Sequence, residues 1–293
     1  MDSQEANIGV VNQEQQRVDE YSVQVLSSSP EMTLRDVVCR GTCRHKSAEE
    51  CATATHLVFP YRGTYVRHVG QDNAVADANQ LIFFSRGESY QVSHPIVGGD
   101  ASLSLSLHEE LLREIIPKEY LRSGNDLAFR VQRVRIDPRA QALVSLLRHG
   151  LSRAVAEPLQ AETLILTLVR RALGERTSRA PASTYGRQRL VDRAKLAISS
   201  EPGRRWQLAE IAAEVGVSPV YLTQSFQQVE GLPLYRYQLR CRLARALDLL
   251  YEYDDLSALA LDLGFSTHSH FTSAFRQTYG RTPAELKRAL RRR

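Results

Sequence analysis

The sequence predicts an α+β protein, with a β-rich N-terminal half completed by helices and an all-α C-terminal domain built on two helix-turn-helix units. Three observations support this fold class. A short helical pattern occurs twice in the last ninety or so residues, β-rich runs dominate residues 33–107, and apolar residues recur with helical spacing between these parts. The 293 residues are enough for two domains with buried cores.

The β-rich domain is expected over residues 33–117, after a polar, flexible lead-in at residues 1–32. Gly and Pro separate several short runs that are rich in β-branched, aromatic and leucine residues. Such spacing is typical of a β-sandwich or a small barrel. The expected strands cover residues 57–59, 64–66, 81–84, 90–92 and 103–107.

A helical hairpin is expected within residues 118–173. Pro138 and Pro158 each stand where the first turn of a helix accepts proline, and apolar residues follow with helical periodicity over 139–154 and 159–173. The pair either covers the β-rich core or joins a second subunit, and the sequence favours neither role. Residues 174–186 lack apolar periodicity and are interpreted as a linker.

The repeated pattern defines a C-terminal domain over residues 187–293. In each copy an Ala lies four residues before a Gly, as Ala212 before Gly216 and Ala260 before Gly264. The small Ala lets two helices approach closely, and Gly permits the tight turn between them. An amphipathic helix over residues 236–253 joins the two units.

Positive charge is concentrated in this domain. Residues 187–293 carry 17 Lys and Arg against 11 Asp and Glu, whereas residues 1–186 carry 21 against 22. This distribution suits a domain that binds a polyanion. Solvated helix faces and the basic end at residues 291–293 are the alternative explanation.

The second helix of each unit presents polar side chains that suit the major groove of DNA. In the first unit Ser218 is expected to cap the helix before Pro219, and in the second Ser266 or Thr267 does so. Hydroxyl, amide and imidazole groups hydrogen-bond to base edges, and a Val or Thr methyl contacts thymine. A rigid joining helix would hold the two recognition helices about one DNA turn, roughly 34 Å, apart. The outward positions are Val220, Thr223, Gln224, Gln227, His268, Ser269, Thr272 and Ser273, with Arg236, Arg240, Arg245 and Arg276 as candidates for phosphate contacts.

These residues resemble the AraC/XylS family of bacterial transcription regulators, over about residues 190–288. The resemblance rests on the two Ala-to-Gly units, on Phe271 and Ala274-Phe275-Arg276, and on the stretch Tyr279-Gly280-x-x-Pro283. The chain departs from many members at Ser273 and Gln224, where basic residues are common, which implies that each recognition helix reads fewer bases or that a dimer is needed. The resemblance implies base contacts from Val220, Thr223, Gln224, Thr267, His268, Ser269, Thr272 and Ser273.

For the N-terminal half, the resemblance implies a cupin-like β-barrel that senses a small-molecule effector, followed by the helical hairpin as a dimerisation element. It also implies double-stranded promoter DNA and RNA polymerase as partners, with activation as the expected effect. An effector-independent DNA-binding co-regulator is the alternative.

Four possible metal ligands or reactive groups cluster within 13 residues: Cys39, Cys43, His45 and Cys51. Three thiols and an imidazole could bind zinc or respond to oxidant, which gives a thiol- or metal-responsive regulator as a further alternative. The spacing matches no standard zinc motif, and thiols without a function are the competing explanation. No cofactor is required by the sequence.

Several classes of protein are disfavoured. No apolar run approaches the roughly 20 residues that a membrane span needs, and the N-terminus lacks a secretory signal. Four cysteines in a chain of this length indicate a reducing, cytoplasmic location. No hydrolase, phosphate-loop or metalloprotease motif is present, so we expect no enzyme; Cys39-x3-Cys43 matches only the first half of the zinc-cysteine pattern of DNA-repair methyl acceptors.

Overall fold

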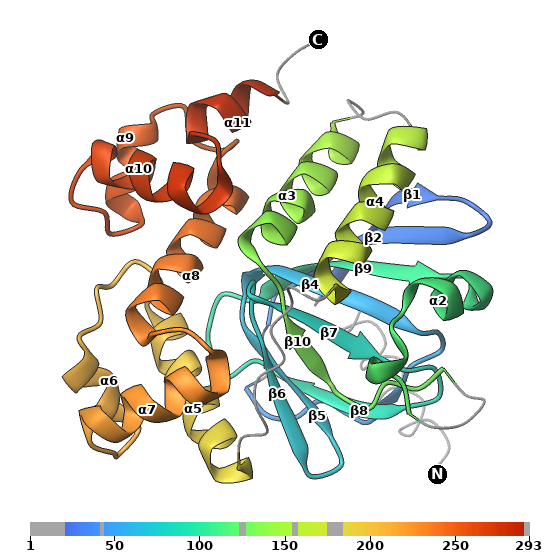
Figure 1. Ribbon diagram of the computed structural model, residues 1–293, viewed down its shortest axis with the longest axis horizontal. Helices are drawn as coiled ribbons and strands as arrows, with labels where there is room; N and C mark the ends of the chain where they lie inside the picture. Colours follow the sequence, from blue (N-terminus) through green and yellow to red (C-terminus); the bar gives the residue numbers. More distant parts are fainter. Residues whose placement is uncertain (1–20, 42–43, 123–126, 154–157, 175–183, 290–293) are drawn as a thin grey trace, which may run out of the picture.

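The strands of the N-terminal part form two antiparallel sheets (Figure 1). The computed structural model describes residues 21–41, 44–122, 127–153, 158–174 and 184–289. Within them, one sheet has the strand order β1-β2-β9-β4-β7-β10 and the other has the order β3-β8-β5-β6. The strands are β1 Tyr21–Ser28, β2 Met32–Cys39, β3 Glu50–Cys51, β4 His56–Gly63, β5 Tyr65–Val69, β6 Asp72–Ala76, β7 Gln80–Phe84, β8 Ser89–Ser93, β9 Asp100–Leu107 and β10 Arg133–Arg135.

Alternation of side chains along the strands builds the core of the larger sheet. In β9, Leu103, Leu105 and Leu107 are buried, whereas the serines at 104 and 106 are half-buried. Leu105 lies opposite Leu34 of β2 and Leu57 of β4, and all three are almost fully buried. A strand with two-residue periodicity thus places one row of leucines in the core.

Helices α3 (Pro138–Ser152) and α4 (Pro158–Leu173) complete this core (Figure 1). Asp137 caps α3 by accepting a hydrogen bond from the amide of Ala140 at 2.9 Å. Val144 and Leu147 of α3 and Leu168 of α4 belong to the same apolar cluster as the leucines of the sheet. The helical pair predicted from the sequence is therefore confirmed, and core packing accounts for its inward faces. Helix α2 (Glu109–Ile115) and the 3-10 turn η1 (Lys118–Tyr120) precede this pair.

The N-terminal part differs from the sequence prediction in three respects. Strand β1 lies inside the segment predicted as a flexible lead-in, of which residues 1–20 are outside the described part. It is an edge strand whose Tyr21, Val23 and Val25 are half-exposed, and Leu26 packs against the core. Strand β10 lies inside the predicted helical segment and pairs with β7. In the described residues neither sheet closes on itself, so the cupin-like barrel is not confirmed.

The C-terminal part consists of helices that form two clusters joined by α8 (Figure 1). One apolar cluster includes α5, α6 and α7, and the other includes α9, α10 and α11. Among the helices in the described part of the chain, none combines the length and the apolar character needed to cross a membrane. The helices are α5 Tyr185–Ser200, α6 Leu208–Glu214, α7 Pro219–Glu230, α8 Leu234–Leu249, α9 Leu256–Asp262, α10 His268–Tyr279 and α11 Pro283–Ala289.

Candidate nucleic-acid interface

The first helix-turn-helix unit consists of α6 and α7. Gly216, in the turn between them, has a φ of 71°, a left-handed conformation that glycine adopts without steric cost. Ser218 caps α7 by accepting a hydrogen bond from the amide of Tyr221 at 3.2 Å, and Pro219 occupies the first helical turn, as predicted. Leu222 and Phe226 are fully buried, so the opposite face of α7 is left outward.

The second unit, α9 and α10, has the same construction. Thr267 caps α10 by accepting a hydrogen bond from the amide of His270 at 3.1 Å, which selects Thr267 over Ser266 as the cap. Gly264 has a φ of 74°, and a Cβ on it would collide with the backbone oxygen of Gly203. Arg205 also donates to the Gly264 carbonyl at 2.6 Å. The loop before α6 therefore packs on the turn of the second unit and ties the two units together.

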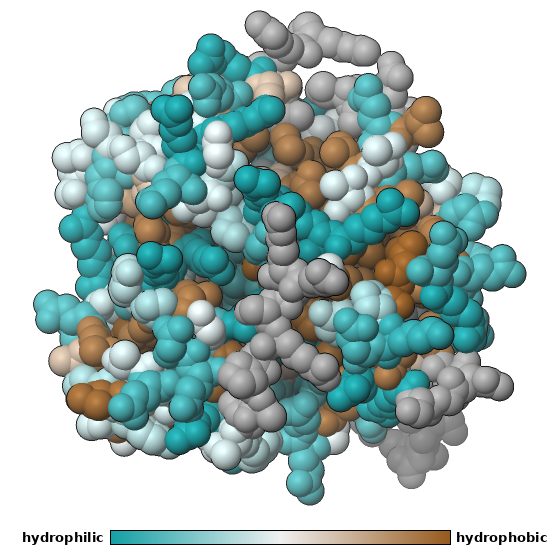
Figure 2. Space-filling view, viewed as in Figure 1, coloured by the Kyte–Doolittle hydropathy of each residue, from teal (hydrophilic) through white to brown (hydrophobic). Residues whose placement is uncertain are grey.

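The predicted reading faces of both recognition helices are open to solvent. Val220 is 67% exposed, and Thr223, Gln224 and Gln227 of α7 are also exposed. On the second unit Thr267, His268, Ser269 and Ser273 are exposed, and Thr272 is half-buried. The side of the molecule that carries α7 and α10 is predominantly hydrophilic, with small separate apolar patches (Figure 2). Tyr221 and His270 are exposed beside these faces as well, although the sequence prediction did not include them.

The four candidate phosphate-binding arginines fall into two groups. Arg236 of α8 and Arg276 of α10 are exposed, as a phosphate contact requires. Arg240 and Arg245 are half-buried, and Arg245 forms an ion pair with the buried Asp248. A phosphate contact by Arg245 would therefore have to compete with this ion pair, whereas Arg236 and Arg276 face solvent.

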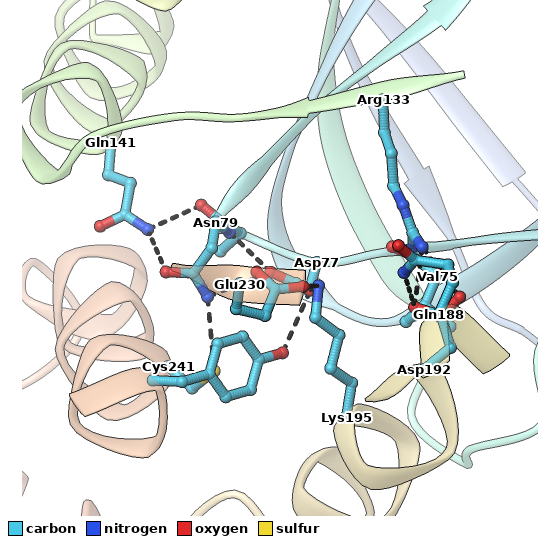
Figure 3. A network of polar contacts seen from close by, with 12 residues as sticks. Val75, Asp77, Asn79, Arg133, Gln141, Gln188, Asp192, Lys195, Glu230 and Cys241 are labelled. Atoms are coloured by element: carbon cyan, nitrogen blue, oxygen red, sulfur yellow. Dashed lines mark hydrogen bonds and ion pairs between the residues drawn. The ribbon is translucent and has the colours of Figure 1, made fainter. Parts of the chain in front are cut away.

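A buried polar network joins the recognition domain to the β-rich part (Figure 3). Lys195 of α5 is fully buried, and its Nζ lies 2.6 Å from Glu230 at the end of α7 and 3.2 Å from Asp77, which follows β6. Tyr237 of α8 donates to the same Asp77 carboxylate at 3.1 Å. Burial lowers the pKa of Lys195, but the two carboxylates raise it by more, so the ammonium stays charged.

Further contacts extend this junction. One nitrogen of the Arg133 guanidinium, on β10, donates to both oxygens of the Asp192 carboxylate of α5, at 2.9 and 2.8 Å. Gln141 of α3 donates to Asn79 at 3.0 Å (Figure 3). The Gln141 side-chain oxygen accepts from Tyr279 of α10 at 3.3 Å. Both helix-turn-helix units are thus attached to the β-rich part. None of these pairs was predicted from the sequence.

A cleft lies beside the network, between the β4–β5 turn and helices α5 and α8. Arg62 and Thr64 line it from the β-rich part, and Arg242 and Arg245 of α8 line it from the opposite side. The β4–β5 turn therefore lies across this cleft from the helix that joins the two recognition units.

Of the four residues predicted as a metal or redox site, the three that the structure describes do not come together as one ligand group. Cys39 ends β2 and is half-buried, His45 and Cys51 are exposed, and Cys43 lies outside the described residues. In the described part of the chain, the metal-ligand side chains that meet are Cys39, His94 and Asp100, whose ligand atoms all lie within 4.8 Å of one another. The set of Cys39, Cys43, His45 and Cys51 stays a prediction.

Comparison with known proteins identifies the C-terminal domain. Residues 211–289 match the helix-turn-helix domain family. The chain is 33% identical over 85 residues to the regulatory protein PocR of Salmonella typhimurium, which covers 29% of this chain and 28% of PocR. It is 33% identical over 91 residues to the transcriptional regulator GadX of Escherichia coli O6:H1, covering 31% and 33% of the two chains. This chain thus spans about a third of the length of these relatives.

One solved structure and one longer relative also match this chain. A transcriptional regulator of Chromobacterium violaceum, described as having an AraC-type DNA-binding domain, is 30% identical, with a TM-score of 0.34. The match covers 36% of this chain and 95% of that one. A putative AraC-like regulator of Streptomyces antibioticus is 25% identical over 199 residues, or 66% of this chain and 63% of the relative.

Proposed function

We propose that this chain, whose C-terminal part belongs to the AraC/XylS family of transcription regulators, binds promoter DNA sequence-specifically through α7 and α10. The observation that supports this most strongly is the pair of capped helices in tandem units, each buried on one face and exposed on its polar face. Held on the common helix α8, the two exposed faces suit successive major grooves of one duplex.

The polar groups on these faces suit base recognition. Gln224 carries a carboxamide that can bond bidentately to adenine, and Thr223 and Ser273 carry hydroxyls that both donate and accept. Arg236 and Arg276 supply exposed positive charge for the backbone, which would make affinity depend on salt. Base contacts specify the site, and phosphate contacts fix the register.

We propose further that the β-rich part controls DNA binding by the C-terminal domain. Lys195 links Glu230, at the end of the first recognition helix, to Asp77 of the β-rich part, and Gln141 contacts Tyr279 of the second recognition helix. A small-molecule effector that binds one arrangement of this junction better than another would shift the C-terminal domain toward the arrangement that it binds better. Effector-independent binding remains the alternative outcome.

Activation through RNA polymerase in the cytoplasm completes the proposal, together with dimerisation through the helical hairpin at the exposed start of α4. Leu159 at the start of α4 is 76% exposed and offers an apolar contact that the chain itself leaves open to solvent. Transcription in vitro with purified RNA polymerase tests the sign of regulation. Analytical ultracentrifugation of wild type against Leu159→Asp tests the dimer.

The DNA-binding proposal is tested on the full chain by fluorescence anisotropy with promoter fragments from its own and neighbouring genes. Thr223→Ala should weaken specific binding about 5- to 150-fold, as loss of a base contact worth about 1–3 kcal/mol predicts, and leave binding to random DNA unchanged. Thr163→Ala is a matched control. Thr223 and Thr163 are both exposed, and each hydroxyl donates to the carbonyl four residues earlier at 2.9 Å.

The proposal fails if the wild-type chain shows no salt-dependent affinity for any of these fragments. It also fails if Thr223→Ala and Thr163→Ala have equal effects on specific binding. Equal melting temperatures of the two variants would show that altered binding does not arise from unfolding.

A further inference from the structure

We propose that the β-rich part binds one divalent transition-metal ion, with Zn²⁺ as the prototype, between Cys39, His94 and Asp100. Their ligand atoms lie within 4.8 Å of one another. The three residues come from separate strands or strand ends. The fold therefore brings them together, and they form no recognisable motif in the sequence. The site is distinct from the set Cys39, Cys43, His45 and Cys51 that residue spacing alone suggests.

Strand register places two of the three ligands. Cys39 is the last residue of β2 and Asp100 is the first of β9, and they are direct partners in the antiparallel ladder. Opposed residues in such a ladder have Cβ atoms about 5 Å apart on the same face of the sheet. His94 follows the last residue of β8, and its Nε2 lies 2.7 Å from Asp100 Oδ1.

Glycines hold the chain ends together at this place. Gly99 has a φ of 67°, and a Cβ on it would collide with the carbonyl oxygen of Cys39. A Cβ on Gly41 would lie 2.6 Å from the Cα of Gly99 and 3.3 Å from the His94 ring. A Cβ on Gly63 would collide with the Gly99 oxygen. Three backbone segments therefore touch directly around the ligand group, and any side chain at these glycines would push the ligands apart.

The chemistry of the three groups suits Zn²⁺ and related ions. Thiolate, imidazole and carboxylate are the ligands that Zn²⁺ takes, at about 2.0–2.3 Å each, so tetrahedral binding needs ligand atoms about 3.3–3.7 Å apart. Ligand atoms up to 4.8 Å apart must approach by about 1–1.5 Å or less, which rotation of the half-buried Cys39 side chain can supply. His94 Nε2 and Asp100 Oδ1, which lie 2.7 Å apart, must separate slightly to admit the ion. A fourth position would be left for water or another ligand, as in open zinc sites.

Burial of the group explains why an ion would be retained. His94 is 6% exposed and Asp100 is 8% exposed, so both are largely withdrawn from competing water. On binding, the proton that His94 Nε2 shares with Asp100 is released to solvent while Nδ1 keeps its own, and the thiol of Cys39 also gives up its proton to solvent. No redox change is involved.

The position of the group connects it to the recognition domain. Asp100 is paired not only with Cys39 but also with Gly63 at the end of β4. The adjoining Arg62 and Thr64 line the cleft against α5 and α8. If the chain is the effector-controlled regulator proposed above, an ion that draws Cys39 and Asp100 together would bias this cleft, and the metal would be the effector.

The test is titration of the reduced full chain with Co²⁺, a spectroscopic substitute for Zn²⁺, and then competition with Zn²⁺. We expect one ion per chain and a thiolate-to-Co²⁺ charge-transfer band in the near ultraviolet. Cys39→Ser should abolish the band, and Asp100→Asn should weaken affinity about a hundredfold, since each ligand contributes a share of that size in zinc sites. Cys51→Ser, which removes an exposed thiol outside the group, should change neither.

Several results would overturn the site. Absence of the band in the wild-type chain would do so, as would a band that survives in Cys39→Ser or disappears in Cys51→Ser. Thermal melts of each variant without metal show whether it is folded, and Asp100→Asn gives an independent readout if Cys39→Ser is unstable. Metal binding is measured without DNA, so its failure would leave the DNA-binding proposal intact, and its success would not depend on that proposal.

Discussion

Replacement of Lys195 by methionine tests whether the buried junction holds the recognition domain on the β-rich part. The ammonium is fully buried between Asp77 and Glu230, at 3.2 and 2.6 Å. Methionine fills a similar volume but leaves two carboxylates without their cation in a site that excludes water. Removal of one partner from a buried ion pair costs about 3–5 kcal/mol, so we expect the free energy of unfolding to fall by about that amount.

Urea denaturation followed by circular dichroism and tryptophan fluorescence measures this change. Lys118→Met makes the same substitution at an exposed lysine and should alter the free energy of unfolding by about 0.5 kcal/mol or less. Glu230→Gln and Asp77→Asn added to Lys195→Met remove the stranded charges and should recover a large part of the loss. Equal effects of Lys195→Met and Lys118→Met would refute the reasoning, as would a triple variant less stable than the single one.

The pH dependence of the difference in free energy of unfolding between wild type and Lys195→Met gives a second check. The pKa of Lys195 in the folded chain is raised above 10.5, its ordinary value, because the two carboxylates outweigh burial. A raised lysine pKa contributes stability that is fully present below pH 10.5 and is lost as the pH rises through the folded-state value. The difference in free energy of unfolding between wild type and Lys195→Met should therefore be constant from neutral pH to about pH 10 and should decrease above that.

Three further predictions concern single residues. In urea denaturation, Gly264→Ala should lower the free energy of unfolding by at least about 1 kcal/mol more than Gly216→Ala does. Both glycines have positive φ, but only a Cβ on Gly264 would meet the backbone of Gly203. Equal losses in the two variants would contradict this packing. Burial and two neighbouring arginines lower the pKa of His149 to about 3. The free energy of unfolding of the wild type should therefore fall by about 2 kcal/mol between pH 6.5 and pH 5, and that of His149→Gln should not. Parallel stability profiles of the two proteins over this pH range would contradict the prediction. Arg276→Ala should make the plot of log affinity against log salt concentration less steep by about 0.9, with specific and with random DNA alike. An unchanged slope would exclude a phosphate contact by Arg276.

The sequence predicted those features that depend on neighbours a few residues apart. The Ala-to-Gly spacing, the caps at Ser218 and Thr267, and the apolar faces of α7 and α10 are all set within one or two helical turns. The outward positions followed from the same periodicity, and the structure leaves nearly all of them exposed. Local geometry of this kind can be read from a single chain.

Features that depend on pairing between distant segments were not predicted. Strand β1 pairs with β2 at the edge of the sheet, and its alternating Tyr21, Val23 and Val25 are half-exposed, so the short strand was grouped with the polar residues that precede it. Lys195, Asp77 and Glu230 come from three separate elements, and each alone looks like a surface charge. Cys39 was grouped with its sequence neighbours, whereas strand register places it opposite Asp100.

A hydroxyl-radical footprint of the full chain on its promoter tests the central claim most directly. Two recognition helices in consecutive major grooves predict two protected segments about 10 base pairs apart on one face of the duplex. Thr223→Ala combined with Gln224→Ala should remove one segment, and His268→Ala combined with Ser273→Ala should remove the other. A single protected segment, or a footprint that both double variants leave unchanged, would contradict the account.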